Sequence, residues 1–236
     1  MGFVDDVKED QTLQIQVLCV AFFLIAFPSY FMIKASDTEN PTGMGGVGSY
    51  TVTADFTYID FASGDADVQD GTPFTLDLNT DSVDAAGKNI VGVLVTMSYG
   101  EDESEDSLDP FGAGCATGGL SPDTITGTAS HLNYSNSADG QNSGGSGSHE
   151  VSTVWYNSSV IGEKIEGLSE SQIIDELDSK GAGMGDYSIE ISVAAQDGST
   201  ATCNREDTGE NVTYTVQLIV LDYSISSFVD VDDIDV

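Results

Sequence analysis

Apolar and polar positions alternate along most of the chain after residue 50. Runs of alternating or β-branched residues recur between clusters of Gly, Asp and Ser, and they cover residues 50–61, 72–78, 89–99, 124–132, 149–156, 187–195 and 212–226. A period of two places alternate side chains on opposite faces of a strand. The pattern therefore predicts an all-β domain over residues 50–227, an antiparallel β-sandwich of about seven strands.

One short segment before the sixth run has helical spacing instead. Ile173, Ile174 and Leu177 recur at the spacing of one helical face, Ser169 stands at the position of an N-cap, and Gly181 follows the end. N-cap serine and a glycine after the last turn are common helix boundaries. We expect one short helix here, between two strands.

The N-terminal part of the chain follows a third pattern. Residues 11–33 carry no charge, which gives 23 positions between Asp10 and Lys34. A helix of that length spans about 35 Å, and a hydrocarbon layer is about 30 Å thick. Residues 11–34 are therefore predicted to form one transmembrane helix in contact with membrane lipid. The alternatives are a cleaved signal peptide, which the acidic start and missing small-x-small site disfavour, and a buried helix of a soluble domain.

These patterns divide the chain into five segments. An acidic N-terminal segment covers residues 1–10, the transmembrane helix 11–34, and a flexible stalk with Pro41 and several glycines 35–49. The β-sandwich covers 50–227, and an acidic tail covers 228–236. A tethered domain needs slack next to the membrane, which is the role expected for the stalk.

The charge of the chain restricts its partners. There are 40 Asp and Glu against 6 Lys and Arg, and the formal net charge is -34. Phosphate recognition needs clustered basic side chains, so nucleic acid is excluded as a partner. Acids spread along the whole chain favour solvation in a salty, halophilic or marine setting, and a store of cation ligands is the alternative.

The side of the membrane is predicted from two cysteines. Cys115 and Cys203 are the two outside the hydrophobic segment, and an even pair far apart in sequence is typical of an exported disulfide. We therefore expect an extracytoplasmic domain, with two unpaired thiols in a cytoplasmic domain as the alternative. Sequons at Asn133, Asn157 and Asn211 permit glycosylation.

The chemical inventory contains no catalytic motif, so no enzyme activity and no cofactor are predicted. The two histidines, His131 and His149, bracket a stretch rich in Gly, Ser and Asn over residues 133–148, which is expected to be a mobile loop. The one candidate ligand is calcium, because Asp65, Asp67 and Asp70 offer hard oxygen atoms in what reads as a loop.

A resemblance adds to the fold prediction. The sixth run begins Gly-x-Tyr and continues through alternating aliphatic residues to an Asp-Gly turn; its residues are Gly185, Tyr187, Ile189, Ile191, Val193, Asp197 and Gly198. This resembles the penultimate strand of immunoglobulin-like and PKD-like ectodomains. The resemblance implies an immunoglobulin-like β-sandwich.

Together these features predict a membrane-anchored extracytoplasmic protein that binds or supports other molecules, through a protein partner or self-association. Adhesion, cell-envelope assembly and partner recognition are the roles expected of such a module. One alternative is a filament subunit, since the chain resembles archaeal and bacterial type IV pilins in placing a hydrophobic helix before a β-rich head. The other is an accessory subunit of a membrane complex.

Overall fold

The structure is a computed structural model that describes Phe22 and residues 47–100, 104–107, 121–142, 145–200 and 203–228. The chain divides into two units, Met1–Val47 and Gly48–Val236, and the described strands all lie in the second. The predicted transmembrane helix, apart from Phe22, lies outside the described residues. Within the described part of the chain, no helix has the length and apolar character needed to cross a membrane.

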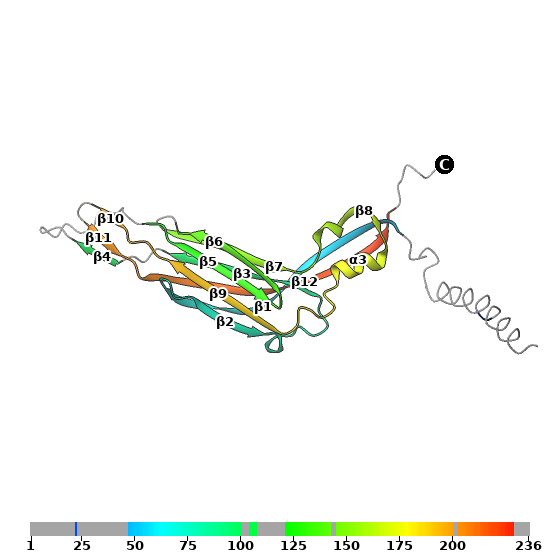
Figure 1. Ribbon diagram of the computed structural model, residues 1–236, viewed down its shortest axis with the longest axis horizontal. Helices are drawn as coiled ribbons and strands as arrows, with labels where there is room; N and C mark the ends of the chain where they lie inside the picture. Colours follow the sequence, from blue (N-terminus) through cyan, green and yellow to red (C-terminus); the bar gives the residue numbers. More distant parts are fainter. Residues whose placement is uncertain are drawn as a thin grey trace, which may run out of the picture. The chain divides into compact units, whose positions relative to one another are not determined.

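The second unit is built almost entirely of strands (Figure 1). The described strands are β1 (Gly48–Gln69), β2 (Phe74–Asn79), β3 (Ile90–Gly100), β4 (Ser104–Ser107), β5 (Thr124–His131), β6 (Tyr134–Gln141), β7 (Ser146–Val154), β8 (Gly162–Leu168), β9 (Asp186–Ala194), β10 (Ser199–Thr200), β11 (Cys203–Glu206) and β12 (Gly209–Ser227). The described helices of this unit are α3 (Glu170–Leu177) and two 3-10 turns, η1 (Thr80–Ser82) and η2 (Ser158–Val160).

Two larger sheets form a sandwich. One has five strands in the order β7-β3-β12-β1-β8, and the other has four in the order β2-β9-β5-β6. A third, small sheet has the order β10-β11-β4. Their strands pair antiparallel, which confirms the predicted class of an antiparallel all-β sandwich.

The main core lies between the two larger sheets. Alternation places one face of each strand inward, and the fully buried side chains of the four central strands include Val93, Val95, Met97, Ile125, Ile189, Ile191, Val216 and Leu218. Gly127 on β5 leaves room here, because a Cβ atom at this position would overlap the end of the Met97 side chain, which would then have to move. The small residue on one sheet thus makes room for the large one on the other.

A second core lies on the opposite face of the five-stranded sheet. We call it the neck core, and it consists of Val52, Val91, Val160, Ile173, Leu177, Ile219 and Leu221. Helix α3 and η2 supply Ile173, Leu177 and Val160. Residues 218–221 of β12 are all buried, because the main core covers one face of the strand and the neck core the other.

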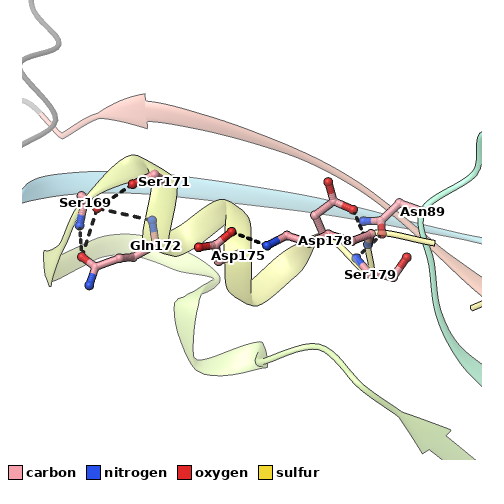
Figure 2. A network of polar contacts seen from close by, with 8 residues as sticks. Asn89, Ser169, Ser171, Gln172, Asp175, Asp178 and Ser179 are labelled. Atoms are coloured by element: carbon pink, nitrogen blue, oxygen red, sulfur yellow. Dashed lines mark hydrogen bonds and ion pairs between the residues drawn. The ribbon is translucent and has the colours of Figure 1, made fainter. Parts of the chain in front are cut away.

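Polar contacts fix both ends of α3 (Figure 2). At its start, the backbone N–H of Gln172 donates to Ser169 Oγ (3.3 Å), and the backbone N–H of Ser169 donates to Gln172 Oε1 (2.9 Å), which is a capping box. Past its end, Asn89 donates to the carbonyls of Leu177 (3.0 Å) and Leu221 (3.2 Å) and accepts from the Ser179 N–H (2.8 Å). The predicted helix and its Ser169 cap are confirmed.

The first and last strands of the sandwich, β1 and β12, lie side by side along almost their whole length (Figure 1). The pairing runs from Tyr50 opposite Ser227 to Gln69 opposite Gly209, with a register shift between Asp60 and Ala62. The chain therefore enters and leaves the domain at one end, the neck end. At about 3.3 Å per residue, the 22 residues of β1 reach about 70 Å to the opposite, distal end.

The seven predicted runs correspond to β1, β2, β3, β5, β7, β9 and β12, but the two larger sheets contain two further strands. The prediction of a loop over residues 133–148 was wrong, since β6 occupies Tyr134–Gln141. β6 is exposed along most of its length and pairs on one side with β5, so its side chains need not be apolar. β8 was missed for a similar reason, because it is an outer strand with little burial and no period of two.

Candidate functional site

The most unusual chemistry of the described residues lies inside the distal end. Asp123 and Glu210 are 0% exposed and Asn142 is 1% exposed. Asp123 directly precedes β5, Asn142 directly follows β6, and Glu210 is the second residue of β12. These positions meet because β5 and β6 form a hairpin whose open end lies at the same end of the sandwich as the start of β12.

Asn142 is the centre of this cluster. Its Oδ1 accepts the backbone N–H of Asp123 (2.9 Å), while its Nδ2 donates to Asp123 Oδ2 (3.1 Å) and to Glu210 Oε1 (2.9 Å). The other oxygen of Asp123 accepts the backbone N–H of Gln196 (2.7 Å). The Asn142 amide thus joins the ends of β5, β6 and β12, and the Asp123 carboxylate joins them to the segment after β9. This is expected where buried polar groups must be hydrogen-bonded.

Asp207 supplies a third carboxylate, and we call Asp123, Asp207, Glu210 and Asn142 the distal cluster. Asp207 Oδ1 accepts the backbone N–H of Gly209 (2.9 Å), in the turn before β12. One ligand oxygen each of Asp123, Asp207 and Glu210 lies within 4.8 Å of the others. Hard cations such as calcium prefer oxygen ligands, and carboxylates supply them. These three residues therefore have the ligand chemistry needed to hold such a cation.

The turn before β12 depends on glycine. Gly209 has a φ of 146°, and a Cβ atom there would overlap the backbone carbonyl of Val68. The adjoining Asp70 N–H donates to the Thr208 carbonyl (2.8 Å). The close approach of this turn to the end of β1 sets the position of Asp207 and Glu210.

The sequence contained one usable signal for this cluster. On β12, Asn211 and Thr213 point to solvent, so alternation places Glu210 on the inward face beside Val212. An acidic residue in an inward position is a candidate for a buried polar site. Asp123 and Asn142 gave no such signal, because each stands outside the strand that it adjoins.

The structure separates the acids predicted to bind calcium. Asp65 and Asp67 lie on the solvent face of β1 rather than in a loop, and Asp70 lies in the turn after it. They accept hydrogen bonds from Thr213 Oγ1 (2.5 Å), from Gln69 Nε2 (2.9 Å) and from the Ala195 N–H (3.1 Å), respectively. Calcium at these three residues stays a prediction.

The predicted disulfide also stays a prediction. Cys115 lies outside the described residues, and the backbone of Cys203 lies in β11 opposite Ser107 of β4. That pairing puts Cys203 in the small sheet at the distal end.

The three sequons lie in different environments. Asn133 is an exposed residue of the β5–β6 turn, and Asn211 is exposed on β12. Asn157 caps η2 by accepting the N–H of Ser159 (3.1 Å), and its Nδ2 donates to Glu176 (2.9 Å). An attached glycan would use that same nitrogen, so Asn157 is the least available of the three.

The two histidines are not exposed loop residues. His131 is 2% exposed and stacks on Tyr187 with 3.9 Å between ring centroids, while its ring nitrogens face the carbonyls of Asp186 and Ala182. His149 on β7 is half-buried against Tyr99, whose hydroxyl lies 3.1 Å from His149 Nδ1. Burial lowers the pKa of His149 and raises the pKa of Tyr99 and of Tyr187.

An open groove of about 740 Å³ crosses the outer face of the five-stranded sheet near the distal end. Small and hydroxyl-bearing residues line it, namely Ser98, Tyr99, Gly100, Ser146, Gly147, Ser148, Asn211 and Thr213. The lining residues come from the neighbouring strands β7, β3 and β12.

No protein-family model and no curated protein matches the chain.

Proposed function

We propose that this chain is a single-pass membrane protein whose acidic β-sandwich stands outside the cytoplasm and acts as a binding or structural module. Residues 11–34 are the proposed anchor, and residues 50–227 are the proposed module. Adhesion, cell-envelope assembly and partner recognition are the roles that suit such a module.

The observation that carries the proposal is the pairing of β1 with β12. The backbone N–H of Phe228 donates to the Ser49 carbonyl (2.9 Å), so both chain ends of the domain lie at the neck end. The turns that join β6 to β7 and β11 to β12 lie about one β1 length away, at the distal end. A chain joined at one end and presenting turns at the other suits a tethered module.

Two sequence features support the proposal. The segment from Gly185 through β9 carries the Gly-x-Tyr and alternating pattern that resembles immunoglobulin-like and PKD-like ectodomains, and such domains are common cell-surface modules. The net charge of -34 suits a protein kept soluble in salt, outside a cell of a halophilic or marine organism.

The test uses the full chain in membranes of its source or of an expression host. We expect it to stay in the membrane fraction after alkaline carbonate washing, and the β-domain to be cleaved by protease added to intact cells. The double variant Leu24→Arg and Ile25→Arg should release the chain, because two charges at a helix centre are costly in lipid. Protection of the domain in intact cells, or wild-type chain in the soluble fraction, would overturn the proposal.

Two other measurements separate the alternatives. Removal of Met1 and the following residues in the mature protein would favour the pilin-like filament subunit. Migration with other proteins in native electrophoresis of solubilised membranes would favour the accessory subunit of a membrane complex.

A further inference from the structure

The position beside β1 in the five-stranded sheet is filled along only part of the strand. β8 pairs with Gly48, Ser49, Tyr50 and Val52, and then turns away. Among the described residues, β12 is the only strand that pairs with β1 beyond Val52. Residues 53–69 of β1 therefore present a sheet edge, with a row of backbone N–H and C=O groups pointing away from β12.

The apolar part of this edge lies next to the neck core. Phe56 and Tyr58 are 36% and 52% exposed, although their partners on β12, Leu221 and Ile219, are buried. The Phe56 ring contacts Tyr156 with 5.6 Å between centroids. Two aromatic side chains on one face give a bound strand an apolar surface against which to pack.

The rest of this edge is acidic. Asp60, Asp65 and Asp67 are exposed and follow Tyr58 on the same face, as their partners Gln217, Thr213 and Asn211 on β12 show. Asp55 is exposed on the other face. Asp60 accepts a hydrogen bond from Gln217 (2.8 Å) and Asp65 from Thr213 (2.5 Å), so the carboxylates are held along the strand.

We infer that residues 53–65 of β1, which we call the open edge, bind an extended segment of a partner protein that carries Lys or Arg at alternate positions. Backbone hydrogen bonds would add this segment to the sheet as a strand in line with β8. Its basic side chains would all lie on the face that carries Phe56, Tyr58, Asp60 and Asp65. Their charges would face Asp60 and Asp65, and their aliphatic stems would pack near Phe56 and Tyr58. The inference rests on the proposed function, since it names the partner of the binding module.

Both the charge of the open edge and the space beside it favour a short basic strand over a second copy of the chain. A second copy of the chain brings the same acids to the edge and a further net charge of -34, which repels. Its β1 has 22 residues and would continue into the position that β8 fills. A short basic strand meets neither obstacle, and acids along an exposed edge discourage association with other acidic strands.

The experiment uses the full chain in detergent and a capped nine-residue peptide of alternating Lys and Val. Deuterium exchange should slow at the outward-facing amides of residues 53–60 when the peptide is added. Two N-methylated peptides keep all the charges, and each blocks the N–H groups of one alternate set of residues. Only one set can face β1, so we expect the affinities of these two peptides to differ at least tenfold.

A charge exchange tests the basic side chains separately. Asp60→Lys with Asp65→Lys should weaken the Lys/Val peptide at least tenfold and create binding of a Glu/Val peptide. Asp81→Lys with Asp84→Lys is the matched control, because both acids are exposed beyond β2 and the net charge changes equally. This control should weaken the Lys/Val peptide less than twofold.

Three results would overturn the inference. They are the absence of binding at 1 mM peptide, equal affinity of the two N-methylated peptides, and equal effects of the two charge-reversed variants. The N-methylated pair needs no variant of the protein, so it decides the matter even if a substitution disturbs folding. The cell-surface protease test is independent of all three, and failure of one proposal is therefore distinguishable from failure of the other.

Discussion

The two ends of the sandwich are closed by opposite means. At the neck end, α3 lays Ile173 and Leu177 over Val52 and Leu221, and the seal is apolar. At the distal end, the seal is the distal cluster, in which Asn142 holds two buried carboxylates. An apolar seal tolerates small shifts of its members, whereas a buried polar seal is strong only when every group has its partner. The stability of the distal end should therefore depend more strictly on the exact positions of its side chains than the stability of the neck end does.

The largest expected effect is at the neck end. Ile173→Ala removes a side chain that is 0% exposed, so it should lower the free energy of unfolding by about 2 to 5 kcal/mol. Urea denaturation measures the loss, and hydrogen exchange should quicken first in β8 and α3. Asp175→Ala on the exposed face of the same helix is the control and should cost less than about 1 kcal/mol. Equal losses from both variants would mean that α3 does not seal the neck core.

The next effect tests the polar seal. Asn142→Ala removes the acceptor for the Asp123 N–H and the donor to two carboxylates, all inside the protein. It should cost about 2 to 4 kcal/mol, because buried partners are left without hydrogen bonds. The neighbouring exposed Gln141→Ala should cost under about 0.5 kcal/mol. Exchange should quicken at the start of β5 and β12 while β8 stays protected, the reverse of the Ile173 variant.

The comparison also explains how far the sequence could predict this molecule. The neck helix was predictable because Ile173, Ile174 and Leu177 stand within one segment at a spacing that only a helix puts on one face. The strands β1, β2, β3, β5, β7, β9 and β12 were predictable for the same reason, with a period of two. Both signals are local, because burial of one face of a helix or strand leaves a periodic pattern of apolar residues in the sequence.

The distal cluster as a whole could not be found in that way, because alternation marks only Glu210 among its members. Asp123, Asn142 and Glu210 come from three strand ends, and only the strand pairing brings them together. The chain has 40 acids, so composition could not single out two of them as buried. β6 was missed because it is exposed to water at most of its positions and carries no apolar alternation. His131 stands at the end of its run, where alternation with Ile125 and Ala129 places it on the inward face, and the loop prediction for the residues after it hid this signal.

A smaller effect measures how much the cap contributes at the neck end. Ser169→Ala removes the Oγ that accepts the Gln172 N–H, and it should cost about 1 kcal/mol. Ser171→Ala is a matched serine in the first turn of α3 whose Oγ contacts Ser169 Oγ (3.0 Å) without capping the backbone, and it should cost less. Urea denaturation compares the two. A greater loss from the Ser171 variant would contradict the capping assignment.

The smallest effect concerns pH and the half-buried His149. Burial lowers its pKa, against smaller opposing effects of the Ala138 carbonyl and Asp139, so the folded protein binds this proton less readily than the unfolded chain. The stability that the neutral ring provides is complete above the ordinary pKa of 6.5 and is lost as pH falls through and below that value. The neutral form also fits the geometry, with Nε2–H donating to Ala138 (3.1 Å) and Nδ1 accepting from the Tyr99 hydroxyl.

His149→Gln should therefore flatten the fall in unfolding free energy between about pH 7.5 and 5.5, below which the many carboxylates begin to titrate. Urea denaturation across that range gives the profile. Because Tyr99 and His149 lie near the distal end, exchange in β6 and β7 should quicken on acidification while α3 keeps its protection. If the neck end opened first on acidification, the assignment of this pH dependence to His149 would be wrong. The view that polar contacts stabilise the distal end and not the neck end would then be wrong as well.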